Sequence, residues 1–219
     1  ISVSGTTTST GTYAGYQGIA TFVASGAGGG ISLSGTTSAT AYRSIQANPI
    51  NIYAASGAIT ITGTGGTGIN LDGTWGKGSL ASSSTNITVT ASSITLNSAT
   101  ISTSGNIKFD GALTIGSDQS FTTSAGTITF TGTINSDAAA TPRALTVDAG
   151  TGSIVFGGVI GATNPLARLT ATASGGIAIN GNITTATSAS MTVVVSPQLS
   201  MSSTTDQTIS FGGAITSIT

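Results

Sequence analysis

Apolar and small polar residues alternate along most of the chain. Segments such as Ile128-Thr129-Phe130 and Leu145-Thr146-Val147 carry an apolar side chain at every second position. This is the pattern of a β-strand with one buried face. The period of 3.6 residues that marks an amphipathic helix is absent, and Thr, Val, Ile and Phe all suit strands. The sequence therefore predicts an all-β protein.

A short unit recurs along this pattern and reads G-x-I-x-F-x-G-x-I in the one-letter code. Its three apolar positions share one face of the strand with the second glycine. We expect that glycine to mark a corner where the strand bends and a side chain would not fit inside. Clear copies begin at Gly105, Gly126, Gly152 and Gly175, a fifth begins at Gln207 without its first glycine, and degraded copies begin at Gly29 and Gly57.

The spacing of the units predicts the architecture. The first Ile of each unit serves as a marker, and the wide gap between Ile59 and Ile107 holds one more unit, at Ile87. A second alternating segment precedes several units, with Phe121, Leu145 and Leu169 at its start. A period of about 24 residues is typical of one turn of a β-helix. The other markers are Ile31, Ile128, Ile154, Ile177 and Ile209.

Stacking these turns predicts an all-β parallel β-helix, a solenoid, of roughly nine irregular turns over the whole chain. Tandem β-sandwiches stay open as the alternative, because the spacings are irregular. Residues 1–104 hold divergent N-terminal turns and residues 105–219 hold the regular repeats, and we expect one continuous β domain. The segment Ile215–Thr219 lacks a polar cap, so we expect either more solenoid beyond it or end-to-end stacking.

One stretch shows the repeat at its clearest: LTVDAGTGSIVFGGVIGATNPLARLTATASGGIAINGNI, from Leu145 to Ile183. It resembles the β-helical repeats of large bacterial surface proteins of the filamentous-haemagglutinin and autotransporter-adhesin type. The resemblance implies a right-handed parallel β-helix that is secreted to the cell surface and serves in adhesion, biofilm or sheath formation. It carries over no active-site motif, because the chain matches none.

Charge is sparse, which narrows the function classes. Only 5% of the residues are charged, the net charge is −1, and there is no His and no Cys. No basic field is present to attract nucleic acid or an anionic membrane. No stretch approaches the roughly 20 apolar residues of a membrane-spanning helix. We expect no nucleic-acid partner and no membrane span.

The sequence contains few residues suited to catalysis or metal binding. Polysaccharide-degrading β-helix enzymes need grouped carboxylates, but Asp110 shares its repeat position with Thr131, Gly157 and Asn180. The calcium-binding β-roll motif is absent, and its nearest approach is Gly63 to Asp72. We therefore expect no enzyme, no catalytic residue, no cofactor and no metal site. The remaining carboxylates are Asp118, Asp137, Asp148 and Asp206.

A row of threonines is the most distinctive ligand-binding candidate. It alternates on one outward face and consists of Thr127, Thr129, Thr131 and Thr133. Thr88 and Thr90 show the same alternation in an earlier unit. Such a row can order water on an ice-binding face or contact a sugar. The unit from Gly152 places Val155 and Val159 at these positions, so a β surface built from Thr for solubility is the preferred interpretation.

The remaining candidates are isolated residues. Trp75 is either an exposed sugar platform or, with more weight, a partly buried loop anchor. Asn86 and Asn182 begin Asn-x-Thr sequons that would accept glycans in a eukaryotic secretory pathway. In a chain this rich in Thr, such sequons also arise by chance.

These observations favour a structural or adhesive segment of an extracellular, cell-surface repetitive protein, such as a stalk, fibre or sheath component. Its partners would be further copies of itself, stacked end to end or side by side as a filament, or host and matrix glycans. The alternative is a carbohydrate- or ice-binding solenoid that uses the Thr rows. A polysaccharide-degrading β-helix enzyme is the remote alternative.

Overall fold

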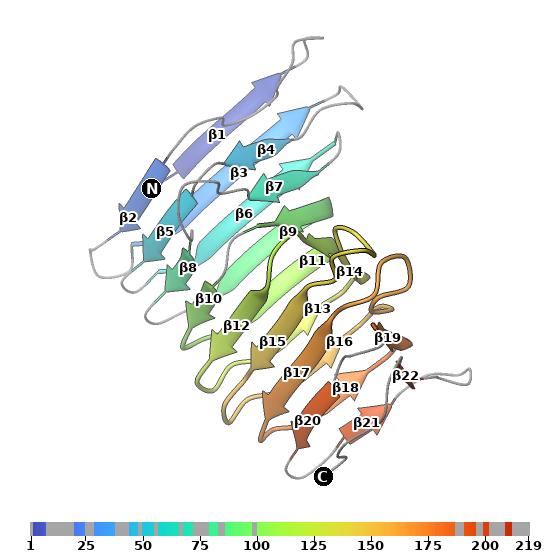
Figure 1. The fold of residues 1–219 in the computed structure, drawn as a ribbon. Helices are drawn as coiled ribbons and strands as arrows, with labels where there is room; N and C mark the ends of the chain where they lie inside the picture. Colours follow the sequence, from blue (N-terminus) through green and yellow to red (C-terminus); the bar gives the residue numbers. More distant parts are fainter. Residues whose placement is uncertain are drawn as a thin grey trace.

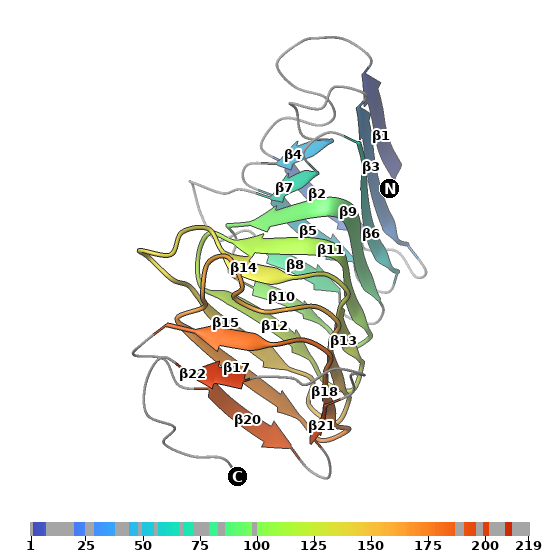
Figure 2. The same cartoon turned by 90° about the vertical axis from the view of Figure 1, so that its right-hand side faces the viewer.

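The computed structural model of the chain describes residues 2–7, 20–24, 29–37, 44–47, 50–54, 57–65, 68–71, 79–82, 86–97, 100–186, 191–195, 199–201 and 209–211. All regular elements in these ranges are β-strands, and they stack in chain order from β1 and β2 at one end to β20, β21 and β22 at the other (Figures 1 and 2). The expected all-β class is confirmed.

The described strands of the stack form three faces. The first face contains β1 (Ser2–Thr7), β3 (Ile31–Thr37), β6 (Ile59–Thr64), β13 (Ile128–Phe130), β16 (Ile154–Phe156), β18 (Ile177–Ile179), β21 (Leu199–Met201) and the first halves of β9 (Ile87–Leu96) and β11 (Ile107–Ile115). The second face contains β4 (Ile45–Ala47), β7 (Ile69–Leu71), β14 (Ile134–Ser136), β19 (Ile183–Thr185), β22 (Ile209–Phe211) and the second halves of β9 and β11.

The third face is a separate sheet. It consists of β2 (Ala20–Ala24), β5 (Ile50–Ala54), β8 (Ser79–Ser82), β10 (Thr100–Thr103), β12 (Gln119–Thr123), β15 (Ala144–Asp148), β17 (Arg168–Ala173) and β20 (Met191–Val195).

All the described strand pairs are parallel, and each joins one turn to the next. Parallel strands stacked in this way form a β-solenoid, and the described structure has about five turns. The nine turns expected from the sequence are more than this. The alternative of tandem β-sandwiches is wrong, because sandwiches are built from antiparallel sheets.

The strand register tests the repeat markers one by one. Ile59 pairs with Ile87, and Ile87 pairs with Ile107, which confirms the unit expected in the wide gap. The last marker is wrong: Ile177 pairs with Leu199, whereas Ile209 pairs with Ile183 on the second face. The final turn therefore replaces the marker Ile with Leu.

On the third face, β12 begins at Gln119, two residues before the expected segment. Gln119 pairs with Leu145, and Phe121 pairs with Val147. A difference of two residues leaves each side chain on the side of the sheet that the alternation predicts. Leu145 pairs with Leu169.

The core consists of columns of apolar side chains that run along the stack. The first column contains Ile31, Ile59, Ile87, Ile107, Ile128, Ile154 and Ile177, each buried to 2% exposure or less. Beside it, Phe130 stacks on Phe156 with ring centroids 5.7 Å apart and an interplanar angle of 5°. Phe121 of the third face meets Phe109 edge-on at 5.1 Å. The aromatic contacts therefore join two faces of the solenoid.

The second glycine of each unit lies where the first face turns into the second. At Gly111 the backbone has φ of +141°, and the register with β9 shifts between Asp110 and Ala112, so the bend expected at this corner is confirmed. A Cβ on Gly132 would lie 2.7 Å from Ala112 N in the preceding turn. The missing side chain thus makes room for the neighbouring backbone, and not for the interior.

Gly132→Ala should destabilise the solenoid. The added methyl group meets backbone, which cannot move aside like a side chain, so we expect the free energy of unfolding to fall by about 1–3 kcal/mol. Urea denaturation measures this. Thr133→Ala is the control, because it alters a half-buried outer side chain beside the same corner and should change stability by no more than about 0.5 kcal/mol. Equal stabilities for the two variants would contradict the close approach of the turns.

Candidate functional site

The outer surface of the first face carries a regular set of hydroxyl groups, which we call the hydroxyl array. Its members lie on β3, β6 and β9 and pair in register, so that Ser32, Thr60 and Thr88 form one column. Adjacent hydroxyls are spaced about 4.8 Å across the strands and about 6.6 Å along them. The full array consists of Ser32, Ser34, Thr36, Thr60, Thr62, Thr64, Thr88 and Thr90, all exposed or half-buried.

The array contains no ionisable side chain, and it ends where charge appears. Thr88 pairs with Lys108, and Thr90 pairs with Asp110. Two turns further on, Val155 occupies the column of Lys108. The hydroxyl array is therefore an uncharged patch in the first part of the stack.

The predicted threonine row lies one turn after Lys108 and Asp110, where the hydroxyl array ends. Thr131 is exposed, while Thr127, Thr129 and Thr133 are half-buried. Thr129 lies between Lys108 and Val155 of the neighbouring turns, so the row is one strand wide.

Thr131 belongs to a small charged cluster. Its hydroxyl donates to Asp110 Oδ1 at 2.8 Å, and Lys108 Nζ donates to Asp110 Oδ2 at 2.8 Å. The hydrogen bonds from Lys108 and Thr131 lower the pKa of the Asp110 carboxyl, against a smaller opposing effect of burial. The side chains of Lys108 and Asp110 are 46% and 40% exposed, so solvent screens their ion pair and it adds little stability.

The third face carries its own hydroxyl columns. Ser120 pairs with Thr146, and Thr146 with Thr170. The neighbouring column contains Thr122, Asp148 and Thr172. Asp148 introduces a carboxylate there, and it accepts a hydrogen bond from Gly150 N at 2.9 Å.

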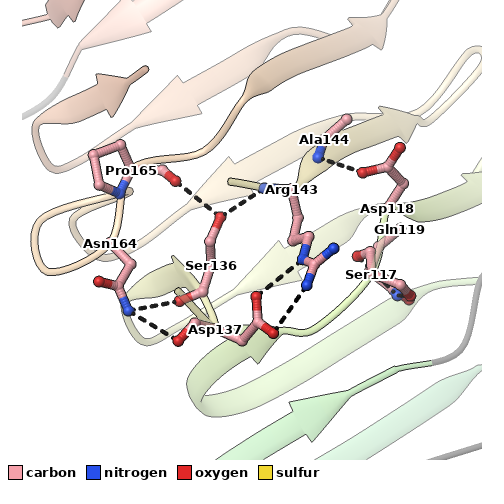
Figure 3. Close-up of polar contacts among 9 residues, drawn as sticks. All are labelled: Ser117, Asp118, Gln119, Ser136, Asp137, Arg143, Ala144, Asn164 and Pro165. Atoms are coloured by element: carbon pink, nitrogen blue, oxygen red, sulfur yellow. Dashed lines mark hydrogen bonds and ion pairs between the residues drawn. The ribbon is translucent and has the colours of Figure 1, made fainter. Parts of the chain in front are cut away.

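Two loops on the edge of the second face are tied together by polar contacts (Figure 3). Arg143 binds Asp137 through two hydrogen bonds, of 2.9 and 3.1 Å. This contact lowers the pKa of Asp137 and raises that of Arg143. Asp118 of the preceding turn accepts from the backbone N–H of Ala144 at 2.8 Å. These carboxylates fix the turn from β14 to β15.

The buried hydroxyl of Ser136 completes this connection. It donates to the carbonyl of Pro165 at 2.8 Å and accepts from the backbone N–H of Arg143 at 2.9 Å. Asn164 donates from its side chain to the carbonyls of Ser136 and Asp137. Asp118, Ser136 and Asn164 bind loop backbone, and Arg143 pairs with the Asp137 side chain, so the cluster explains how these loops pack.

The remaining candidates from the sequence are Trp75, two aspartates, a metal site and the two glycosylation sequons. Trp75, Asp72 and Asp206 lie outside the described residues, so their expected roles stay predictions. Within the described ranges, no three His, Cys, Asp or Glu side chains gather where they could hold a metal ion. Asn86 and Asn182 are both exposed, and Asn86 Oδ1 accepts from the backbone N–H of Asn106 at 3.0 Å.

The extent of the hydroxyl surfaces was not predicted from the sequence. The predicted row from Thr127 to Thr133 had its repeat at Thr88 and Thr90, whereas the array joins Thr60 and Thr88, on strands 28 residues apart. Aligning the outer positions of the degraded copies at Gly29 and Gly57 would have revealed it, because serine and threonine alternate there as well.

In comparisons with known proteins, no family model, no curated protein and no solved structure matches the chain. Over the described ranges, no helix is long and apolar enough to span a membrane.

Proposed function

We propose that the chain is a structural segment of an extracellular, cell-surface repetitive protein, a stalk, fibre or sheath component without catalytic activity. The observation that carries this proposal is the unbroken stacking of apolar columns along the described turns, from Ile31 to Ile177. A solenoid of this kind lengthens by adding turns without changing its cross-section. Such a solenoid is therefore suited to form a long stalk or fibre.

The finer architecture belongs to the same proposal. The turns are right-handed, because about 98% of crossovers between parallel strands of one sheet have that hand. Roughly nine turns fit the whole chain, and the strand order β1-β3-β6-β9-β11-β13-β16-β18-β21 along the first face supports this number. The resemblance to filamentous-haemagglutinin and autotransporter-adhesin repeats supports a bacterial surface location and an adhesive or biofilm role.

The partners that suit this role are further copies of the chain and host or matrix glycans. Few surface charges oppose close packing of copies, since the charged residues are 5% of the chain. Serine and threonine hydroxyls on two faces offer hydrogen bonds to sugar hydroxyls in either direction.

Antibodies raised against the purified chain test the location. Applied to intact cells of the source organism, they should label the outer surface, because a stalk or sheath component lies outside the cell envelope. Immunogold electron microscopy gives the readout, with permeabilised cells as the control. Labelling that requires permeabilisation would overturn the extracellular role.

A second function is favoured by the hydroxyl array. We propose that this array binds a flat, uncharged and regular surface, either a crystalline polysaccharide or ice. Its columns are held in register by the buried Ile and Leu residues between them, as in the alternation of β3. A rigid array loses little conformational entropy on binding.

Thr62→Lys tests the array. It places a charge at the centre of the uncharged patch and should weaken cosedimentation with crystalline polysaccharide, or ice-recrystallisation inhibition, by roughly tenfold or more, a loss of about 1.4 kcal/mol. Thr170→Lys on the third face is the matched control and should retain activity. Blank results for the unaltered chain in both assays, or equal losses in the two variants, would remove this function.

A further inference from the structure

Asn180 and Gly181 lie at the glycine corner between the first and second faces. The backbone N–H of Asn180 donates to the carbonyl of Phe156 at 2.9 Å, which holds the main chain against the preceding turn. The Asn180 side chain is exposed, and none of the described residues forms a hydrogen bond with it. Nor does any described residue accept the N–H of Gly181. An amide electrophile and a backbone nucleophile are thus adjacent, and no described residue engages either of them.

We propose that Asn180 is a site of spontaneous deamidation, which converts the folded protein at one defined position. The backbone nitrogen of Gly181 attacks Cγ of Asn180 and forms a new C–N bond. The side-chain nitrogen leaves as ammonia, and the product is a cyclic succinimide. Water then opens one of the two ring C–N bonds and yields either aspartate or isoaspartate. Glycine offers no side chain to hinder the attack.

The same corner contains a protected counterpart three turns earlier. Asp110 precedes Gly111, but both carboxylate oxygens are hydrogen bonded, one to Lys108 and one to Thr131. The N–H of Gly111 donates to the Thr131 hydroxyl at 3.2 Å, so the nucleophile is engaged as well. The carboxylate is held ionised, and an ionised carboxylate is a poor electrophile.

Three other asparagines of this region are followed by residues that slow the attack more than serine does after Asn135. Asn182 and Asn106 precede β-branched isoleucines, whose side chains crowd the backbone nitrogen. Asn164 precedes Pro165, which has no N–H. Asn180 is the only asparagine of the sequence that is followed by glycine.

Conversion would change the corner in two ways. It adds a negative charge to a chain whose net charge is −1. The isoaspartate product also inserts one backbone atom between β18 and β19. Space is short there, because a Cβ on Gly181 would lie 2.7 Å from the carbonyl carbon of Gly158. The reaction would therefore loosen the turns after β18 as the protein ages.

Incubation of the folded chain in mildly alkaline buffer tests the proposal. Peptide mapping by mass spectrometry should show conversion at Asn180 at least about tenfold faster than at Asn182, a difference of about 1.4 kcal/mol in barrier height. Labelling by an isoaspartyl methyltransferase should detect isoaspartate in the same peptide. The chain unfolded in urea shows the rate that the Asn-Gly sequence has by itself.

Two variants separate the outcomes. Asn180→Gln removes the reactive pair and should abolish the isoaspartate signal, whereas Asn182→Gln should leave it unchanged. Both alter exposed side chains, and circular dichroism checks that they remain folded. An Asn180 peptide that stays intact in the folded chain while it converts in urea would overturn the proposal, because the fold would then protect the site. Isoaspartate that persists in Asn180→Gln would overturn it as well.

Discussion

Register between neighbouring turns is the constraint on which the rest of the structure depends. Parallel strands lie about 4.8 Å apart, so each side chain must pack against the residue at the same position in the turns before and after it. Apolar residues therefore align in columns, as Phe130 and Phe156 do. Where the backbones themselves approach, only glycine fits, as at Gly132.

The outer surface is freer, because no neighbouring turn encloses it. Hydroxyls occupy the first face in the early turns, from Ser32 to Thr90, and are replaced there by Lys108, Asp110 and Val155. On the third face they continue to Thr170 and Thr172. The interior therefore repeats the same residue types from turn to turn, whereas the exterior does not. The loops vary too, and the one from β14 to β15 contains an ion pair between Asp137 and Arg143.

Much of the fold could be predicted from the sequence, because register repeats the same chemistry at each turn. The marker at Ile87 was found although its unit has Ala91 in place of the second glycine, since the spacing required it. Ile209 was misassigned because Ile is accepted equally in the columns of two faces, and only pairing distinguishes them. The hydroxyl array could not be found along one strand, because it forms only when separate turns are brought together.

Disulfide cross-linking measures the register most directly, because the chain has no cysteine of its own. Thr129 and Val155 are paired outward positions of successive turns, and disulfides form when Cα atoms are about 4.4–6.8 Å apart. The variant Thr129→Cys/Val155→Cys should close an intramolecular disulfide under mild oxidation. Thr129→Cys/Ala178→Cys, which spans two turns at about 9.6 Å, should not. Equal cross-linking in both variants, or none in the first, would contradict in-register stacking.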